Sequence, residues 1–125
     1  MRLMKVRPYA TMVRRQLTED SMSAVDIRQT AVADILRTLR NLKAEARGRF
    51  KAELKGIFGS YARSEAKAGS DLDVLVEFDA GANLLDLVGL SLYLEERLGC
   101  PVDVVPESAL RPELRSGILQ ETISL

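Results

Sequence analysis

Two apolar runs that carry aspartates near their starts, residues 71–78 (DLDVLVEF) and 101–105 (PVDVV), constrain the fold most strongly. Runs of this length that are rich in valine and leucine predict strands that are largely shielded from water. Side chains at positions i and i+2 of a strand share a face, so Asp71 and Asp73 are expected to point the same way. Asp103 repeats the arrangement between two valines. The chain therefore places carboxylates on strands where burying a charge is costly.

The remaining segments alternate between helical and extended patterns. The expected elements are a helix over 26–47, a strand over 53–59, about two helical turns over 60–67 stopped by Gly69, a helix over 84–99 ended by Gly99, and a helix that starts at Pro112. Together with the two aspartate-bearing strands, this order favours a sheet with helices packed on it. We therefore predict one compact α/β domain of two layers.

The length of 125 residues allows one domain with a real core, and is too short for two of typical size. Residues 1–21 contain five basic and two acidic residues and lack the continuous apolar core of a secretory signal. We interpret them as an N-terminal extension, disordered or due to an upstream start, with Met22 as a natural beginning. The domain is accordingly expected over residues 22–125.

Composition excludes several classes of site and partner. The chain has no histidine and one cysteine, which excludes Ser-His-Asp triads, imidazole bases and soft-metal sites. Any metal would be a hard ion held by carboxylates. The 18 basic and 18 acidic residues balance, which argues against direct nucleic-acid binding. No apolar stretch approaches the ~20 residues of a membrane span. The single cysteine, Cys100, fits a reducing compartment, so a cytoplasmic protein is expected. We expect Cys100 itself to be a small buried hydrophobe.

The helix predicted over residues 84–98 is unusually rich in leucine. Its apolar residues leave few polar positions, so it is either buried on most sides or has one face that awaits a partner. The spacing does not distinguish these alternatives, and a homo- or hetero-oligomer through this helix is one of them.

The three aspartates suggest a metal site if their strands are neighbours. Two carboxylates at the spacing of Asp71 and Asp73 repel each other by roughly 2 to 3 kcal/mol at an effective dielectric near 20, and a cation between them removes that cost. With Asp103 on an adjacent strand, three carboxylates would converge, a ligand set that suits Mg²⁺ or Mn²⁺. The alternative for any one of them is a turn cap or a solvated residue of an edge strand.

The pair Gly59-Ser60 suggests a binding site for phosphate. Glycine lets the backbone approach an anion closely, and the N–H groups that open the predicted helix would favour negative charge. Ser60 could cap this helix or donate its hydroxyl to a phosphate oxygen, and Arg63 could reach the same anion. The alternatives are an ordinary N-cap for Ser60 and a solvated surface residue for Arg63. Together with the aspartates, the layout suits in-line attack on a nucleoside triphosphate with pyrophosphate leaving.

The spacing of Gly59-Ser60, Asp71-Leu72-Asp73 and a later Asp103 resembles the signature of the DNA polymerase beta type nucleotidyltransferase superfamily. The chain is most similar to its minimal members, the MNT proteins, over roughly residues 32–125, including the closing stretch VDVVPESALRPELRSGILQE. The resemblance implies a mixed-sheet α/β fold, Mg²⁺ and a nucleoside triphosphate, usually ATP. It assigns Gly59 and Ser60 to phosphate, and the three aspartates to metal ligation.

The resemblance also implies a partner. Minimal members often act as antitoxins that pair with a helical HEPN ribonuclease toxin and transfer AMP onto its tyrosine. No second substrate domain is evident, which favours a macromolecular acceptor. Two alternatives stay open, namely a non-catalytic antitoxin that neutralises by binding, and a small-molecule nucleotidyltransferase with a separate acceptor-binding subunit. The chain departs from the family at Ser64, where glycine is common, and we expect this change to be mild because the position is predicted to be helical.

Overall fold

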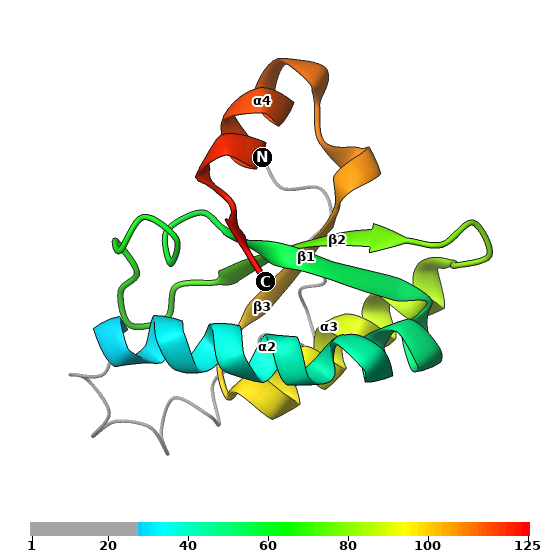
Figure 1. Cartoon of the computed structure of the whole chain (residues 1–125), viewed down its shortest axis with the longest axis horizontal. Helices are drawn as coiled ribbons and strands as arrows, with labels where there is room; N and C mark the ends of the chain where they lie inside the picture. Colours follow the sequence, from blue (N-terminus) through cyan, green and yellow to red (C-terminus); the bar gives the residue numbers. More distant parts are fainter. Residues whose placement is uncertain (1–27) are drawn as a thin grey trace.

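The helices and strands follow the predicted alternation in the computed structural model, which describes residues 28–125 (Figure 1). The elements in chain order are α2 (Arg28–Phe50), β1 (Ala52–Phe58), β2 (Leu72–Phe78), α3 (Leu84–Leu98), β3 (Val102–Pro106), the short 3-10 helix η2 (Glu107–Ala109), α4 (Pro112–Glu121) and β4 (Ile123–Ser124). The predicted extension over residues 1–21 lies outside the described residues.

The sheet is mixed, with strand order β3-β2-β1-β4. β2 and β3 run parallel because α3 forms the crossover between them, whereas β1 is antiparallel to both β2 and β4. This confirms the predicted mixed sheet and makes β2 a central strand. β2 therefore has a neighbouring strand on both sides, and its first five residues are all buried.

Helices α2 and α3 cover one face of the sheet, and α4 lies on the other side (Figure 1). The core fills the space between the two helices and the sheet and includes Leu39, Leu90, Leu54 and Val74, all at most 1% exposed. The amphipathic spacing of α2 thus buries one stripe, as predicted. By contrast, none of the residues in the described helix α4 is buried.

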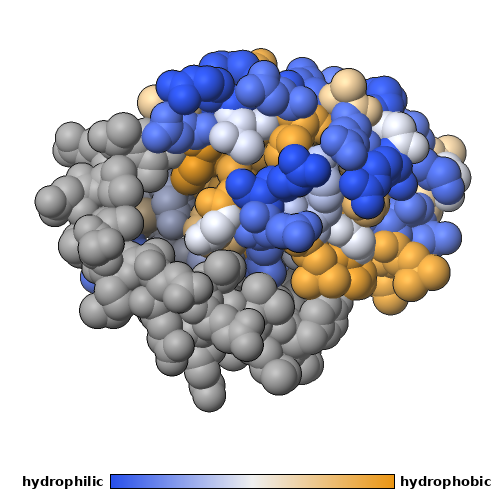
Figure 2. Space-filling model, turned by 90° about the horizontal axis from the view of Figure 1, so that it is seen from below, coloured by the Kyte–Doolittle hydropathy of each residue, from blue (hydrophilic) through white to orange (hydrophobic). Residues whose placement is uncertain are grey.

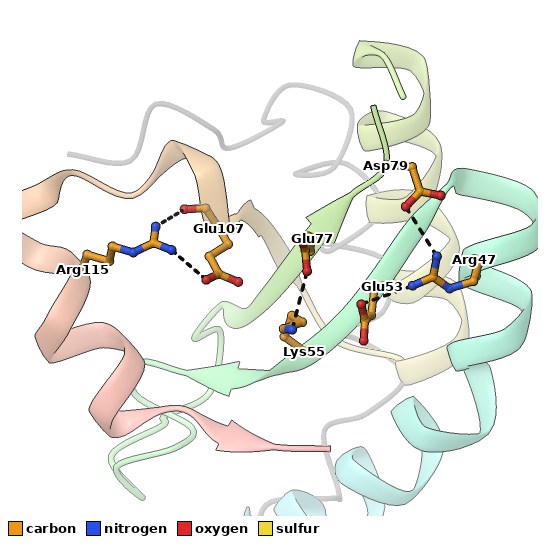
Figure 3. Close-up of polar contacts among 7 residues, drawn as sticks. All are labelled: Arg47, Glu53, Lys55, Glu77, Asp79, Glu107 and Arg115. Atoms are coloured by element: carbon orange, nitrogen blue, oxygen red, sulfur yellow. Dashed lines mark hydrogen bonds and ion pairs between the residues drawn. The ribbon is translucent and has the colours of Figure 1, made fainter. Parts of the chain in front are cut away.

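Charged pairs mark the outer face of the sheet and the ends of the helices (Figure 3). Arg47 at the end of α2 bonds both Glu53 on β1 at 3.2 Å and Asp79 after β2 at 3.4 Å. Lys55 lies 3.6 Å from Glu77 on the neighbouring strand. Because Glu53 and Lys55 alternate with buried residues along β1, they identify the face of the sheet that meets water.

Helix α3 combines features of the two alternatives for the leucine-rich segment. Asn83 and Asp86 form a capping box at its start, and Gly99 in the left-handed conformation ends it. One side is buried against the sheet, whereas Leu84 and Leu85 at its start are 69% and 78% exposed. Figure 2 views the molecule from the helical side and shows an apolar cluster at one edge of a largely hydrophilic surface. The helix is therefore a core element with an exposed apolar beginning.

Two short elements had no counterpart in the prediction. Residues 107–109 form the 3-10 helix η2, and the two-residue strand β4 pairs with β1 at Gly56 and Ile57. An added side-chain carbon at Gly56 would overlap the Ile123 carbonyl, so this glycine permits the close approach of the C-terminal strand. Among the helices of the described part of the chain, none has the length and apolar character needed to cross a membrane.

Candidate active site

Asp73 and Asp103 lie side by side in the sheet. They are a register pair of the parallel strands β2 and β3, and neighbouring strands are roughly 4.8 Å apart. Val74 and Val104, which follow them, belong to the core beneath the helices, so the two aspartates point to the opposite face. Both are buried, at 1% and 2% exposure. The condition set by the sequence, that the two aspartate-bearing strands be neighbours, is therefore met.

Asp71 lies just before β2 rather than within it. The strand begins at Leu72, whose N–H donates to the Pro101 carbonyl at 2.8 Å. Asp71 is partly exposed, in contrast to Asp73 two residues later. The aspartates thus differ in environment, with a buried pair on the strands and, just before β2, a partly exposed Asp71 that has one buried carboxylate oxygen.

Gly59 is packed directly against Asp73. It follows the end of β1, where Phe58 is paired with Asp73 on β2, and its φ of 79° is in the left-handed region. A side-chain carbon at this position would overlap the Asp73 Oδ2 atom. Both the backbone conformation and the contact therefore require glycine here.

The predicted helix over residues 60–67 is wrong, because the chain forms successive turns over residues 59–64 instead. The Arg63 N–H donates to the Gly59 carbonyl at 3.0 Å, and the Glu65 N–H to the Ser60 carbonyl at 2.8 Å. Ser64 has a φ of 61°, which ends any helical path. An anion at this turn would therefore meet individual backbone N–H groups rather than a helix dipole.

The expectation that Ser64 replaces glycine at little cost loses its basis. It assumed a helical position, whereas the left-handed conformation favours glycine over serine. The frequent glycine of the family thus has a physical reason that this chain does not satisfy.

Replacing Ser64 by glycine is expected to stabilise the protein by about 1 kcal/mol, because it removes the left-handed strain of a residue with a Cβ. Thermal unfolding would show this as a melting temperature higher by roughly 4 °C. The matched control is Ser116→Gly in the exposed middle of α4, where the same change should destabilise by about 0.5 to 1 kcal/mol. Equal effects at the two positions would contradict the assignment of strain to Ser64.

Arg63 and Gly59 share a partner that the sequence did not suggest. The Gly59 N–H donates to Glu121 Oε2 at 2.8 Å, and Arg63 Nη1 lies 3.2 Å from both carboxylate oxygens of Glu121. Arg63 also donates through Nε to Glu65 at 3.0 Å. The hydrogen bonds to Glu65 and Glu121 raise the pKa of Arg63. Glu121 is separated from Gly59 by 62 positions, so no local pattern could have indicated the contact.

The thiol of Cys100 lies in the environment of Asp71. Burial raises the pKa of Cys100 to about 12, and the carboxylates of Glu95 and Asp71 contribute to the increase, while a hydrogen bond with Tyr61 opposes it. Glu95 is itself buried and accepts a hydrogen bond from the Val102 N–H at 2.9 Å. The thiol therefore stays protonated at neutral pH and is a poor nucleophile, in keeping with a packing role.

The carboxylates fit a hard divalent cation in their donor chemistry and in the placement of their strands. Oxygen ligands from Asp71, Asp73 and Asp103 are those that Mg²⁺ prefers. Within residues 28–125, no three acidic, cysteine or histidine side chains already converge as a metal site would require. A metal shared by all three aspartates therefore requires at least one carboxylate to turn toward the others.

Comparisons with known proteins point to one family. The family model described as "Nucleotidyltransferase domain" matches residues 39–125. "Protein adenylyltransferase MntA" of Thermococcus cleftensis is 43% identical over 81 residues, which cover 65% of this chain and 82% of that protein. "Putative protein adenylyltransferase MJ0435" of Methanocaldococcus jannaschii is 52% identical over 69 residues, which cover 55% and 74% of the two chains.

A solved structure supports the same conclusion at the level of the fold. It is described as "Structure of putative minimal nucleotidyltransferase", has a TM-score of 0.64 and 44% sequence identity, and covers 74% of this chain and 94% of that one. The matched residues 39–125 include the turn at Gly59, both aspartate-bearing strands and Glu121. The fold implied by the resemblance is thereby confirmed. The chain belongs to the minimal nucleotidyltransferases and is an enzyme of the nucleotidyltransferase class.

Proposed function

We propose that the protein transfers AMP from ATP to an acceptor protein in a Mg²⁺-dependent reaction. The observation that carries the proposal is the register pair of Asp73 and Asp103, buried beside the Gly59 turn. A pair of like charges opposite each other on neighbouring strands is destabilising, so a catalytic use explains its presence better than a structural one. The names of the relatives, which describe them as protein adenylyltransferases, support AMP as the transferred group.

In this proposal the site residues have separate roles. Gly59, Ser60 and Arg63 bind the β- and γ-phosphates, and the three aspartates hold Mg²⁺. The metal, when bound, neutralises negative charge on the phosphates. The tight packing of Gly59 on Asp73 keeps the phosphate turn and the carboxylates in a fixed relation, which favours one orientation of the triphosphate.

The reaction is an in-line displacement at the α-phosphorus. A hydroxyl oxygen of the acceptor forms a bond to the α-phosphorus while the bond to the bridging oxygen of the β-phosphate breaks, and pyrophosphate leaves with that oxygen. The hydroxyl proton passes to the carboxylate of Asp103 or to water. The products are the AMP ester of the acceptor and pyrophosphate, with no change in oxidation state.

The acceptor we propose is a tyrosine of a HEPN-type ribonuclease toxin, which makes this protein an antitoxin. The resemblance to minimal members supports the choice. Residues 39–125 match a single nucleotidyltransferase domain, and this region contains no second domain that would bind a small acceptor. The exposed leucines Leu84 and Leu85 at the start of α3 offer an apolar surface for such a protein. The same exposed leucines favour the second candidate, an antitoxin that neutralises by binding alone.

One experiment separates these candidates. The protein is incubated with α-labelled ATP and Mg²⁺, with and without the product of the neighbouring gene, and both chains are analysed by mass spectrometry. We expect the mass of one AMP on a tyrosine of the partner, and its loss in the Asp71→Ala variant or when EDTA removes the metal. The partner with that tyrosine replaced by phenylalanine is the matched control.

Two other results would change the assignment. A tight complex without AMP on either chain would replace the transferase proposal by the binding antitoxin. Label on an added sugar or drug rather than on protein would indicate a small-molecule nucleotidyltransferase.

A further inference from the structure

The carboxylate of Glu121 accepts hydrogen bonds from two groups that the sequence analysis assigned to phosphate binding, the Gly59 N–H and the Arg63 guanidinium. It accepts the Gly59 N–H at 2.8 Å and lies 3.2 Å from Arg63 Nη1 through both oxygens. These contacts combine a backbone N–H with a guanidinium, which is the donor set that binds an anion well. The turn therefore binds an anion that belongs to the chain itself.

The fold brings Glu121 to this position through the C-terminal strand. Glu121 is the last residue of α4, and β4 begins two residues later with Ile123 paired to Ile57 of β1. The Thr122 hydroxyl donates to the Ile118 carbonyl at 2.6 Å, and the Leu125 N–H donates to the Lys55 carbonyl at 3.1 Å. The backbone at the end of α4 is thus fixed by strand pairing, and the side chain of Glu121 points back to the turn.

The contact is not buried deeply enough to be permanent. The side chains of Arg63 and Glu121 are 47% and 30% exposed, so water can reach both. None of the residues of the described helix α4 is buried, so core packing does not hold this helix in place. The glutamate can leave the turn by rotating about its side-chain bonds, with or without movement of the helix.

We propose that Glu121 is an internal competitor of the triphosphate, which occupies the phosphate turn in the nucleotide-free protein and is displaced when a phosphate group binds there. The inference rests on the proposed function, since it takes the Gly59 turn as the triphosphate site. The Gly59 backbone has a single N–H, which already donates to Glu121, so a phosphate oxygen can accept it only when the carboxylate leaves; a phosphate at the same Arg63 Nη1 would also be repelled by that carboxylate. Binding of nucleotide therefore requires release of Glu121, and this requirement lowers nucleotide affinity.

The contact also links the site to the C-terminal part of the chain. When the triphosphate takes the Gly59 N–H, α4 loses its tie to the turn, while β4 stays paired with β1. Leu114 and Leu119 on α4 are 53% and 39% exposed and lie on the element whose attachment changes. Where release of the glutamate moves the helix, the occupancy of the nucleotide site changes the surface presented by α4.

The test is a comparison of nucleotide affinity between the wild-type protein and Glu121→Gln, measured by calorimetry on the full chain. Glutamine keeps the shape and an oxygen that accepts the Gly59 N–H, but it removes the charge that binds Arg63. We expect MgATP and inorganic triphosphate to bind about 10-fold more tightly to the variant. Adenosine, which has no phosphate, is expected to bind both proteins equally.

Two further variants act as controls. Glu113→Gln removes a charge from the same helix, where Glu113 pairs with Arg111, and should leave affinity unchanged. Glu121→Ala removes both the charge and the acceptor and should tighten binding as well. Circular dichroism melts identify any variant that does not fold, and the inference then rests on the one that does.

The outcomes separate this inference from the proposed function. Equal or weaker binding of MgATP by Glu121→Gln, with the wild type binding normally, would overturn the inference and show that Glu121 supports the turn. The proposed function would be unaffected. Failure of every protein to bind either MgATP or inorganic triphosphate would overturn the proposed function and this inference together. Binding that is detected only in the variant would support both.

Discussion

Replacing Asp73 by asparagine is expected to lower the rate of AMP transfer by at least about 10³-fold, because it removes a buried charge where the metal and the phosphates must be held. Asp73 is 1% exposed, is paired with Asp103 and touches Gly59. Asparagine has nearly the same shape, so the effect isolates the charge. The measurement is the initial rate of label transfer from α-labelled ATP to the partner protein.

Stability should respond differently to the same change. Two carboxylates opposite each other on neighbouring strands repel, and the asparagine removes one of the two charges. The melting temperature in metal-free buffer is therefore expected to hold or rise, while activity is lost. In the wild type, addition of Mg²⁺ with ATP should raise the melting temperature, and the variant should not respond.

Asp79→Asn is the matched control for Asp73→Asn. Asp79 follows the other end of the same strand, is half exposed and pairs with Arg47, so the identical chemical change there should leave transfer unchanged. Transfer by Asp73→Asn at a rate within 10-fold of wild type would contradict the assignment of this carboxylate to the reaction.

The strands that carry the aspartates could be predicted because their patterns are local. Val and Leu runs indicated β2 and β3 within one or two residues, and the leucine-rich pattern that ends at Gly99 indicated α3. The neighbouring placement of Asp73 and Asp103 needed more, because register between parallel strands depends on the crossover through α3. From the sequence, the three carboxylates could be expected to converge only if the two strands were neighbours, and in the sheet β2 and β3 are neighbours.

The turn over residues 59–64 was not predictable from its local amino-acid sequence. Residues 61–67 include alanine, arginine, glutamate and lysine, which favour helix, and so the local propensity indicated one. Tertiary contacts override it, because Gly59 must pass Asp73 in a left-handed conformation and Ser64 adopts a second one. Helix propensity is a weak preference, and a continuous helix is incompatible with two positive φ angles within six residues.

Glu121 and β4 were missed for a different reason. A two-residue strand is too short for any alternation to be visible, and it forms only because the Gly56 backbone lets Ile123 approach. The contact between Glu121 and the Gly59 turn follows from that pairing. Site residues that belong to local motifs, such as Gly59-Ser60 and Asp71-Leu72-Asp73, could therefore be recognised from the sequence. The carboxylate of Glu121, which binds the turn from 62 positions away, could not.

Gly59→Ala is expected to reduce both stability and activity, since the added methyl group meets two obstacles. The first is the φ of 79°, which costs a residue with a Cβ about 1 kcal/mol. The second is the overlap with Asp73 Oδ2, which forces the carboxylate or the turn to move and costs about 1 to 3 kcal/mol more. A shift of about 1 Å in this carboxylate should lower transfer by about 10²-fold.

Gly69→Ala separates the two contributions, because Gly69 has a φ of 85° and no neighbouring atom within 4 Å of an added carbon. It should lose only the conformational part of the stability and keep full transfer activity. Denaturant unfolding and the rate of label transfer, measured for both variants, give the difference that belongs to the contact with Asp73. If Gly59→Ala were no less stable than Gly69→Ala and equally active, the close packing of the turn on the carboxylate would have no part in the reaction. A larger loss at Gly59 in both measurements would show that one glycine sets the position of the phosphate turn and of the aspartate together.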